Sequence, residues 1–153
     1  MIKKRIIPSL LIDNKRLVKT MKFKEKKYVG DPLNAIKIFN EKFVDELIIL
    51  NISKNVNKIG IDYEFYRDLF SECFVPVTYG GGISSLNDAD KIFKLGVEKV
   101  CLNTSVLNNK NIIKEFVKKF GSQSVVVSID VKKNLFYQYK IYNNKSDKIE
   151  KNL

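Results

Sequence analysis

Short apolar segments alternate with segments of helical spacing along most of this chain of 153 residues. Five of the segments are rich in β-branched and apolar residues, as strands are, and the intervening ones place apolar residues every three or four positions. This alternation predicts an α/β fold in which parallel strands are joined by helical crossovers. The expected strands are Arg5–Ile12, Asp45–Leu50, Val75–Tyr79, Lys99–Leu102 and Ser124–Asp130.

Four helices are expected between or beside these strands. Asp31 and Pro32 supply a cap and a first-turn proline for one helix, and Ser84 or Ser85 can cap another. The other two are expected at Ile61–Phe70 and Asn111–Phe120.

The remaining segments are expected as connections. A hairpin turn is expected at Asp13-Asn14, leading into a strand at Arg16–Thr20, and a further hairpin strand is expected at Leu135–Tyr142. The loops are a lysine-rich one at Met21–Gly30 and a polar one at Asn51–Gly60. A frayed polar tail is expected at 143–153, so that residues 1–142 form the folded domain.

A two-unit block of sequence occurs twice. Lys37-Ile38-Phe39 and Val44 to Ser53 are echoed by Lys91-Ile92-Phe93 and Val97 to Ser105, at offsets of about 52 to 54 positions. Repetition of a βαβα block favours a (β/α) barrel over a doubly wound sheet. In such a barrel the chemistry lies at the carboxyl ends of the strands. Those ends are Leu11, Asn51, Gly80–Gly82, Asn103-Thr104 and Asp130.

Small and polar residues follow two consecutive strands. Gly80, Gly81 and Gly82 come directly after one strand, and Asn103, Thr104 and Ser105 come directly after the next. A helix begins after each, and unpaired N–H groups with a positive dipole at a helix start suit a phosphate. The alternative is that the glycines only form a tight turn.

The chain contains no histidine. This excludes histidine-based nucleophile activation and most zinc sites, so proton transfer falls to Asp, Glu, Lys, Tyr or Cys, and we expect no metal or cofactor. Asp130 is the only carboxylate among the expected strand ends; it is either catalytic or a turn residue.

Cys73 and Cys101 follow no metal spacing and are expected as reduced thiols in the cytoplasm. No apolar run reaches the ~20 residues of a membrane helix.

The net charge of +11 is concentrated near the ends of the sequence. Residues 1–28 carry +8 and residues 132–153 carry +4, whereas the middle carries −1. A basic segment can attract an anionic small molecule or a nucleic acid, or can reflect a lysine-rich composition. Because no nucleic-acid-reading motif accompanies the charge, we expect a small-molecule ligand and no nucleic acid.

A set of motifs in chain order resembles the cyclase subunit of the imidazole glycerol phosphate synthase family over about residues 1–133. The motifs are Arg5-Ile6-Ile7-Pro8, Val18-Lys19, Gly30-Asp31-Pro32, Asp45-Glu46-Leu47, Gly80-Gly81-Gly82-Ile83, Asn103-Thr104-Ser105, Phe120-Gly121-Ser122-Gln123 and Ser128-Ile129-Asp130. The resemblance implies a (β/α)8 barrel lyase of histidine biosynthesis. Such a subunit receives ammonia through the barrel from a partner glutaminase and cyclises a bis-phosphorylated substrate.

The resemblance also implies roles for individual residues. Gly81, Gly82, Asn103 and Thr104 fall in or beside the positions that hold a substrate phosphate, and Lys19 falls on a lysine of a mobile loop near the substrate. Asp130 matches one of two acid/base aspartates. Arg5, Glu46 and Lys99 match three of the four charged residues that form an ammonia gate at the opposite end of the barrel.

Two positions depart from the family pattern. Leu11 stands where the family has its other catalytic aspartate, and Asn51 also replaces an aspartate. A leucine cannot transfer protons, and Asp13, in the expected turn, is not expected to substitute for it. Leu11 therefore favours the paralogous branch found with surface-polysaccharide genes, which resembles an ammonia-delivering partner in the conversion of an acetamido sugar to an acetamidino sugar.

The chain offers about five barrel strands where the family has eight. We therefore expect a partial, truncated barrel with open sheet edges, and self-association, for example of two copies through those edges. The alternative function is a catalytically inactive fragment that only binds a phosphate ligand or the partner glutaminase.

Overall fold

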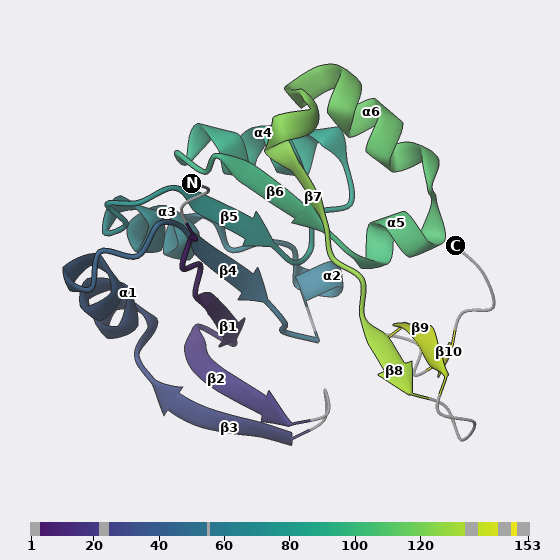
Figure 1. Ribbon diagram of the computed structural model, residues 1–153. Coiled ribbons are helices and arrows are strands. Elements are labelled where there is room, and N and C mark those ends of the chain that lie inside the picture. The colour runs from purple at the N-terminus through teal and green to yellow at the C-terminus, as the bar shows by residue number, and fades with distance from the viewer. Residues whose placement is uncertain (1–3, 22–24, 55, 134–137, 144–147, 150–153) are drawn as a thin grey trace. The chain divides into compact units, whose positions relative to one another are not determined.

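The computed structural model describes residues 4–21, 25–54, 56–133, 138–143 and 148–149. The chain divides into two compact units, Met1–Val100 and Cys101–Leu153, and each is described by itself. Figure 1 labels their helices and strands.

The sheet of the first unit has a parallel part and an antiparallel part. Strand β1 (Ser9–Asp13) runs parallel to β4 (Leu47–Asn51), which runs parallel to β5 (Val77–Gly80). On its other side β1 pairs antiparallel with β2 (Arg16–Met21), which pairs with β3 (Glu25–Gly30). The order is thus β3-β2-β1-β4-β5. The expected parallel strands with helical crossovers are confirmed for β1, β4 and β5.

Among the described residues of this unit, four helices lie between or after these strands, and local side chains set the starts of several of them. They are α1 (Pro32–Glu41), α2 (Val56–Ile59), α3 (Tyr63–Ser71) and α4 (Leu86–Lys94). Asp31 accepts hydrogen bonds from the amides of Leu33 and Asn34, so the predicted cap of α1 is confirmed. Ser85 caps α4 as predicted.

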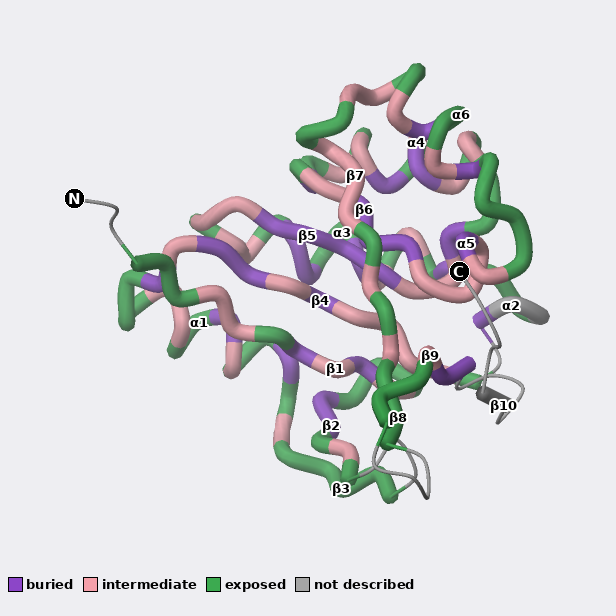
Figure 2. Tube along the Cα trace, turned by 45° about the vertical axis from the view of Figure 1, so that its right-hand side comes forward, coloured by how far each residue is buried: buried purple, intermediate pink, exposed green. Residues whose placement is uncertain are grey.

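The core of the first unit lies on one face of the sheet. Leu47, Ile49 and Tyr79 are fully buried, whereas Ile48 and Leu50 on the other face of β4 are only half-buried. Tyr79 packs edge-on against Tyr66 of α3, with ring centroids 4.7 Å apart. The second face of β4 is thus covered less than the first. Figure 2 shows the buried stretches of β4 and β5 and, at the far edge of the sheet, the exposed β3.

Two of the predicted loops in this unit contain regular structure. The lysine-rich segment 21–30 was predicted as a loop, which is wrong for its described part, because β3 pairs with β2 over Glu25–Gly30. The polar loop predicted at 51–60 contains the short helix α2. The hairpin turn after Asp13 is confirmed. Asn14 and Lys15 both have positive φ, 49° and 64°, as a type I′ turn requires.

The second unit begins within β6 (Lys99–Leu102) and continues through α5 (Thr104–Asn108), α6 (Asn111–Phe120), η1 (Ser122–Ser124) and β7 (Val125–Val127). A small antiparallel sheet follows, made of β8 (Val131–Lys133), β9 (Tyr139–Asn143) and β10 (Lys148–Ile149) in the order β10-β9-β8. The amide of Ser128 donates to the carbonyl of Leu102 at 2.8 Å, which ties the segment after β7 to β6.

The predictions for this unit hold in part. The strand predicted at Ser124–Asp130 is shorter, and Asp130 lies in the connection between β7 and β8. The predicted hairpin strand at Leu135–Tyr142 is found as β9 within its described residues. Most of the tail predicted at 143–153 lies outside the described residues; of it, Asn143 and Lys148-Ile149 belong to paired strands.

Candidate functional site

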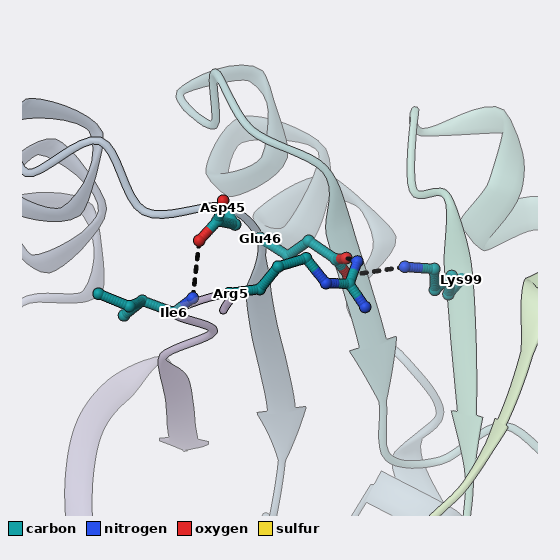
Figure 3. A network of polar contacts seen from close by, with 5 residues as sticks. All are labelled: Arg5, Ile6, Asp45, Glu46 and Lys99. Carbon is teal, nitrogen blue, oxygen red and sulfur yellow. Dashed lines mark hydrogen bonds and ion pairs between the residues drawn. The ribbon is translucent and has the colours of Figure 1, made fainter. Parts of the chain in front are cut away.

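Three charged side chains meet where the parallel strands of the first unit begin (Figure 3). Glu46, directly before β4, has a side chain that is only 9% exposed. Its Oε1 pairs with the guanidinium of Arg5, and its Oε2 accepts from Lys99 Nζ at 2.6 Å. We call Arg5, Glu46 and Lys99 the strand-start cluster. One buried carboxylate with two cations gives the cluster a net charge of +1.

Backbone pairing holds the cluster in place. Asp45 Oδ2 accepts from the amide of Ile6 at 2.7 Å, and the amide of Asp45 donates to the carbonyl of Ile6 at 3.0 Å. The amide of Ile48 donates to the carbonyl of Pro8. The segment before β1 therefore lies along the start of β4, which brings Arg5 to Glu46 across 41 positions of sequence.

Exposed apolar side chains lie on the segments that precede the same strands. Ile6, Phe43 and Phe74 are 68%, 90% and 82% exposed, and we call them the strand-start patch. Asn40 links the turns of the two phenylalanines: its carbonyl accepts from the amide of Phe43, and its Oδ1 accepts from the amide of Phe74. Phe43 also has a φ of 53°, an unfavourable conformation for a non-glycine residue. Large exposed apolar side chains held together in this way indicate a contact surface.

The carboxyl ends of the same strands are less charged. Leu11 on β1 is half-buried and has Leu50 and Val18 as register neighbours. Gly81, with φ of 107°, approaches Asn51 so closely that a Cβ atom at Gly81 would lie 2.1 Å from the Asn51 carbonyl oxygen. Glycine is thus required at this position both for conformation and for space.

Asp13 lies on the same face of β1 as Leu11, because side chains alternate along a strand. Its Oδ1 pairs with Lys26 Nζ of β3 at 2.8 Å, and Lys26 Nζ lies 3.4 Å from the carbonyl oxygen of Ile52. Asp13 is therefore engaged in an ion pair that joins β3 to the ends of β1 and β4.

The start of α4 already holds a carboxylate. Asp88 Oδ2 accepts from the amides and the hydroxyls of Ser84 and Ser85, at 2.9 to 3.1 Å. Burial opposes ionisation of this group, but the hydrogen bonds from the two serines keep the pKa of Asp88 below its ordinary value. The amides of Ser84 and Ser85, which we expected to be available for a phosphate, are thus used within the protein.

In the second unit, Asn103 connects to Asp130. Asn103 Nδ2 donates to the carbonyl of Ser128 at 3.0 Å and lies 3.5 Å from Asp130 Oδ2. Thr104 Oγ1 lies 3.5 Å from Asn103 Oδ1. Burial raises the pKa of Asp130, and the Asn103 amide works against this rise.

The predicted residues thus fall into separate groups. The structure brings Arg5, Glu46 and Lys99 together, and it joins Asn103 to Asp130 and Thr104. Gly81 and Gly82 belong to the first unit and Asn103 and Thr104 to the second, so their joint hold on one phosphate stays a prediction. Lys19, predicted on a mobile loop, is an exposed residue of β2 opposite Lys27.

The sequence analysis did not predict the strand-start patch at Phe43 and Phe74. It also did not predict that Asp88 accepts hydrogen bonds at the start of α4. The spacing Ser85-x-x-Asp88 was available as a capping-box signal. The exposure of Phe43 and Phe74 follows from tertiary structure and had no comparable signal.

Among the described residues, no helix is both long and apolar enough to span a bilayer. Within the same residues, no group of three or more Cys, Asp or Glu side chains is arranged to hold a metal ion.

Comparison with known proteins gives consistent matches. The family model described as "Histidine biosynthesis protein" matches residues 5–151. The "Putative imidazole glycerol phosphate synthase subunit hisF2" of Pseudomonas aeruginosa is 51% identical over 143 residues, 94% of this chain and 57% of that protein. The "Imidazole glycerol phosphate synthase subunit HisF" of Methanococcus maripaludis is 42% identical over 134 residues, 88% of this chain and 49% of that protein. The chain thus spans about half the length of the curated relatives it matches.

Proposed function

The chain belongs to the histidine biosynthesis protein family, and we propose that it acts as the ammonia-accepting barrel subunit of a glutaminase-coupled enzyme. Family membership confirms the resemblance to the cyclase subunit of imidazole glycerol phosphate synthase, and with it the expected fold class, an α/β partial (β/α)8 barrel. The activity, the substrate and the partner are proposals for this chain.

The strand-start cluster is the observation that carries the proposal. Burying Glu46 costs free energy unless the carboxylate is paired, and here each oxygen has its own cation. A cluster of net charge +1 repels ammonium but exerts no such force on neutral ammonia. A paired but rearrangeable cluster at this position is what an ammonia entrance requires, and this supports the gate roles of Arg5, Glu46 and Lys99.

The strand-start patch supports a protein partner at the same end. Ile6, Phe43 and Phe74 are exposed and lie on the segments before β1, β4 and β5. Aromatic side chains are enriched at the centres of protein interfaces. We propose that a glutaminase subunit docks on this patch and delivers ammonia at the cluster.

Asp130 is the proposed acid/base group. Burial raises the pKa of this carboxyl group, and Asn103 holds its side chain by a hydrogen bond. Leu11 leaves the carboxyl end of β1 without the second aspartate of the family. We therefore propose the sugar branch, in which the subunit supplies ammonia for acetamidino-sugar formation, rather than imidazole ring closure.

A phosphorylated ligand is proposed at the glycine-rich turn. Gly81 and Gly82 have φ of 107° and 76°, so the backbone there turns as glycine alone allows. Asp88 uses the amides of Ser84 and Ser85, which leaves the turn itself, with Asn103 and Thr104, as the proposed phosphate contacts. Lys19 on β2 is the proposed cation for the ligand.

A second candidate is a non-catalytic protein that binds phosphate or the glutaminase and associates with itself. Val127, Ile129 and Val131 are 37%, 48% and 50% exposed, and they alternate along one extended segment. Such a stripe favours pairing with a second copy. Light scattering tests this: a monodisperse monomer without dye-accessible apolar surface contradicts self-association.

We also propose a cytoplasmic location, which suits the two free thiols, Cys73 and Cys101.

The proposed function is tested by reconstitution. The chain is mixed with the glutaminase subunit of imidazole glycerol phosphate synthase, and products are measured by mass spectrometry with glutamine and either an acetamido sugar nucleotide or the bis-phosphorylated nucleotide substrate. We expect amidination of the sugar, reduced about 100-fold or more by Asp130→Asn and unaffected by the exposed control Glu115→Gln. No glutamine-dependent product from either substrate, or equal activity of Asp130→Asn, contradicts the proposal.

A further inference from the structure

A cavity of about 300 Å³ lies beside Gly82 in the first unit. Its apolar side includes Val56 and Ile61, which pack so closely on Gly82 that a Cβ atom there would lie 2.6 Å from Val56 Cγ2. Its polar side is formed by Ser84, Asp88 and Lys91 of the α4 segment. The volume is at the lower end of the range for ligand pockets, and it is large enough for a phosphate with part of a sugar.

The carboxylate in this cavity is satisfied by the protein. Asp88 Oδ2 accepts from Ser84 and Ser85, and Tyr63 Oη lies 3.4 Å from Asp88 Oδ1. Burial, and then the Asp88 charge, raise the pKa of Tyr63, so the phenol stays a hydrogen-bond donor. The oxygens of Asp88 thus have hydrogen-bond donors within the protein, and the group keeps its negative charge.

The cation in this cavity is Lys91, an exposed residue of α4. Lys91 Nζ lies 5.2 Å from the centroid of the Tyr63 ring, which orders the ammonium group. In the part of the chain that the structure describes, Lys91 forms no ion pair, whereas Lys94, one turn further along α4, pairs with Asp90 at 2.9 Å. An ordered ammonium group without an ionic partner in a cavity is suited to an anionic ligand.

We propose that this cavity binds an anionic group of the ligand, a phosphate or a similar oxyanion, and that Lys91 is its cation. The inference deepens the proposed function, because it adds Lys91 to the contacts proposed at the glycine-rich turn. The ligand is held by an ammonium group over the Tyr63 ring, while the amides at the start of α4 stay bound to Asp88.

The test is a titration of the full chain with inorganic phosphate, at constant ionic strength in chloride, followed through backbone amide chemical shifts. We expect shifts at Gly82 and Lys91, and about threefold to tenfold weaker binding in Lys91→Gln. Lys91→Arg retains binding. The matched control Lys94→Gln removes the same charge from the same helix and leaves the affinity unchanged.

The outcomes separate the inference from the proposed function. If phosphate shifts Gly82 and Thr104 but Lys91→Gln binds as the wild type does, the role of Lys91 is overturned and the phosphate site of the proposed function stands. An equal loss of affinity in Lys91→Gln and Lys94→Gln reflects general charge and also overturns the inference. If phosphate moves none of these amides in the wild type, both proposals fall.

Discussion

The two ends of the parallel strands in the first unit hold different kinds of side chain. Where β4 and β6 begin, a buried carboxylate binds two cations, and exposed aromatic side chains lie on the segments beside them. Where β1, β4 and β5 end, the corresponding positions are Leu11, Asn51 and glycine. The starting ends thus carry charges suited to guiding a small molecule. The carboxyl ends in this unit have a tight backbone turn and few side chains that can transfer protons.

Under the proposed function, this difference separates the delivery of ammonia from the chemistry that uses it. The carboxylate nearest to Leu11 along β1, Asp13, is bound to Lys26. We therefore propose Asp130 of the second unit, whose pKa is raised by burial, for proton transfer. Under this proposal the subunit delivers ammonia through its strand-start cluster even where its own capacity for ring closure is reduced.

The largest effect is expected at the carboxyl ends, from Gly81→Ala. The new Cβ atom would lie 2.1 Å from the Asn51 carbonyl oxygen in a backbone of positive φ, so we expect a loss of about 3 kcal/mol or more in the free energy of unfolding. Urea denaturation measures it. The control is Gly96→Ala, which has a φ of 93° but nothing within 4 Å of its Cβ, and should lose about 1–2 kcal/mol. Equal losses would show that the close approach to Asn51 does not shape this end.

The next effect is expected at the starting ends, from Glu46→Gln. This change leaves Arg5 and Lys99 without their carboxylate. Because Arg5 is largely exposed and Lys99 partly so, we expect a loss of about 2 kcal/mol in stability, less than for a fully buried pair.

Glu46→Gln should also reduce the rate of product formation, and the reduction should be larger when glutamine is the nitrogen source than when ammonium salts are supplied directly. Parallel assays with both sources measure the difference. Glu98→Gln, which changes an exposed neighbour of Lys99, serves as the control. An equal reduction with both sources would remove the gate role of the cluster.

A smaller effect is expected from Asp88→Ala, which removes the carboxylate at the start of α4. We expect a loss of about 1 kcal/mol at pH 7. Because the pKa of Asp88 is lowered in the folded state, its contribution is fully present above the ordinary pKa of about 3.9 and is lost as the pH falls through the lower folded value.

Urea denaturation between pH 7 and pH 2 measures this contribution. The difference between wild type and Asp88→Ala should shrink as the pH falls. Asp90→Asn, on the same helix, tests an exposed ion pair and should cost about 0.5 kcal/mol. A difference for Asp88→Ala that stays constant down to pH 2 would mean that the Asp88 charge does not stabilise α4.

An effect on stability similar to that of Asp88→Ala, about 1 kcal/mol, is expected from Leu11→Asp, because Leu11 is half-buried. If the carboxyl ends are otherwise intact, this change should give measurable ammonia-dependent cyclisation of the nucleotide substrate. Leu11→Asn has a similar shape without a titrating proton and should give none. Equal activity of the two variants would show that a carboxylate at the end of β1 is not what distinguishes the two branches.

Local signals predicted the helices well, whereas pairing over long distances was harder to predict. The cap at Asp31 and the hairpin turn depend on neighbouring residues; the cap is confirmed, and the turn expected at Asp13-Asn14 is found one position later, at Asn14-Lys15. Strand β3 was missed because its lysines disfavour a strand, and pairing with β2 overrides that preference. The strand-start cluster joins residues 41 and 53 positions apart, which periodicity alone cannot reveal; the family resemblance pointed to it.

The most direct measurement of the central claim is the affinity of the full chain for the glutaminase subunit of imidazole glycerol phosphate synthase, by isothermal titration calorimetry. The wild-type chain should bind, and Phe43→Ser with Phe74→Ser should weaken binding by about 30-fold or more, since each phenylalanine is a candidate hot spot. Ile59→Ser, which changes another exposed apolar residue, should have no effect. If the wild-type chain does not bind, or if the double variant binds equally well, the strand starts are not the ammonia-receiving end.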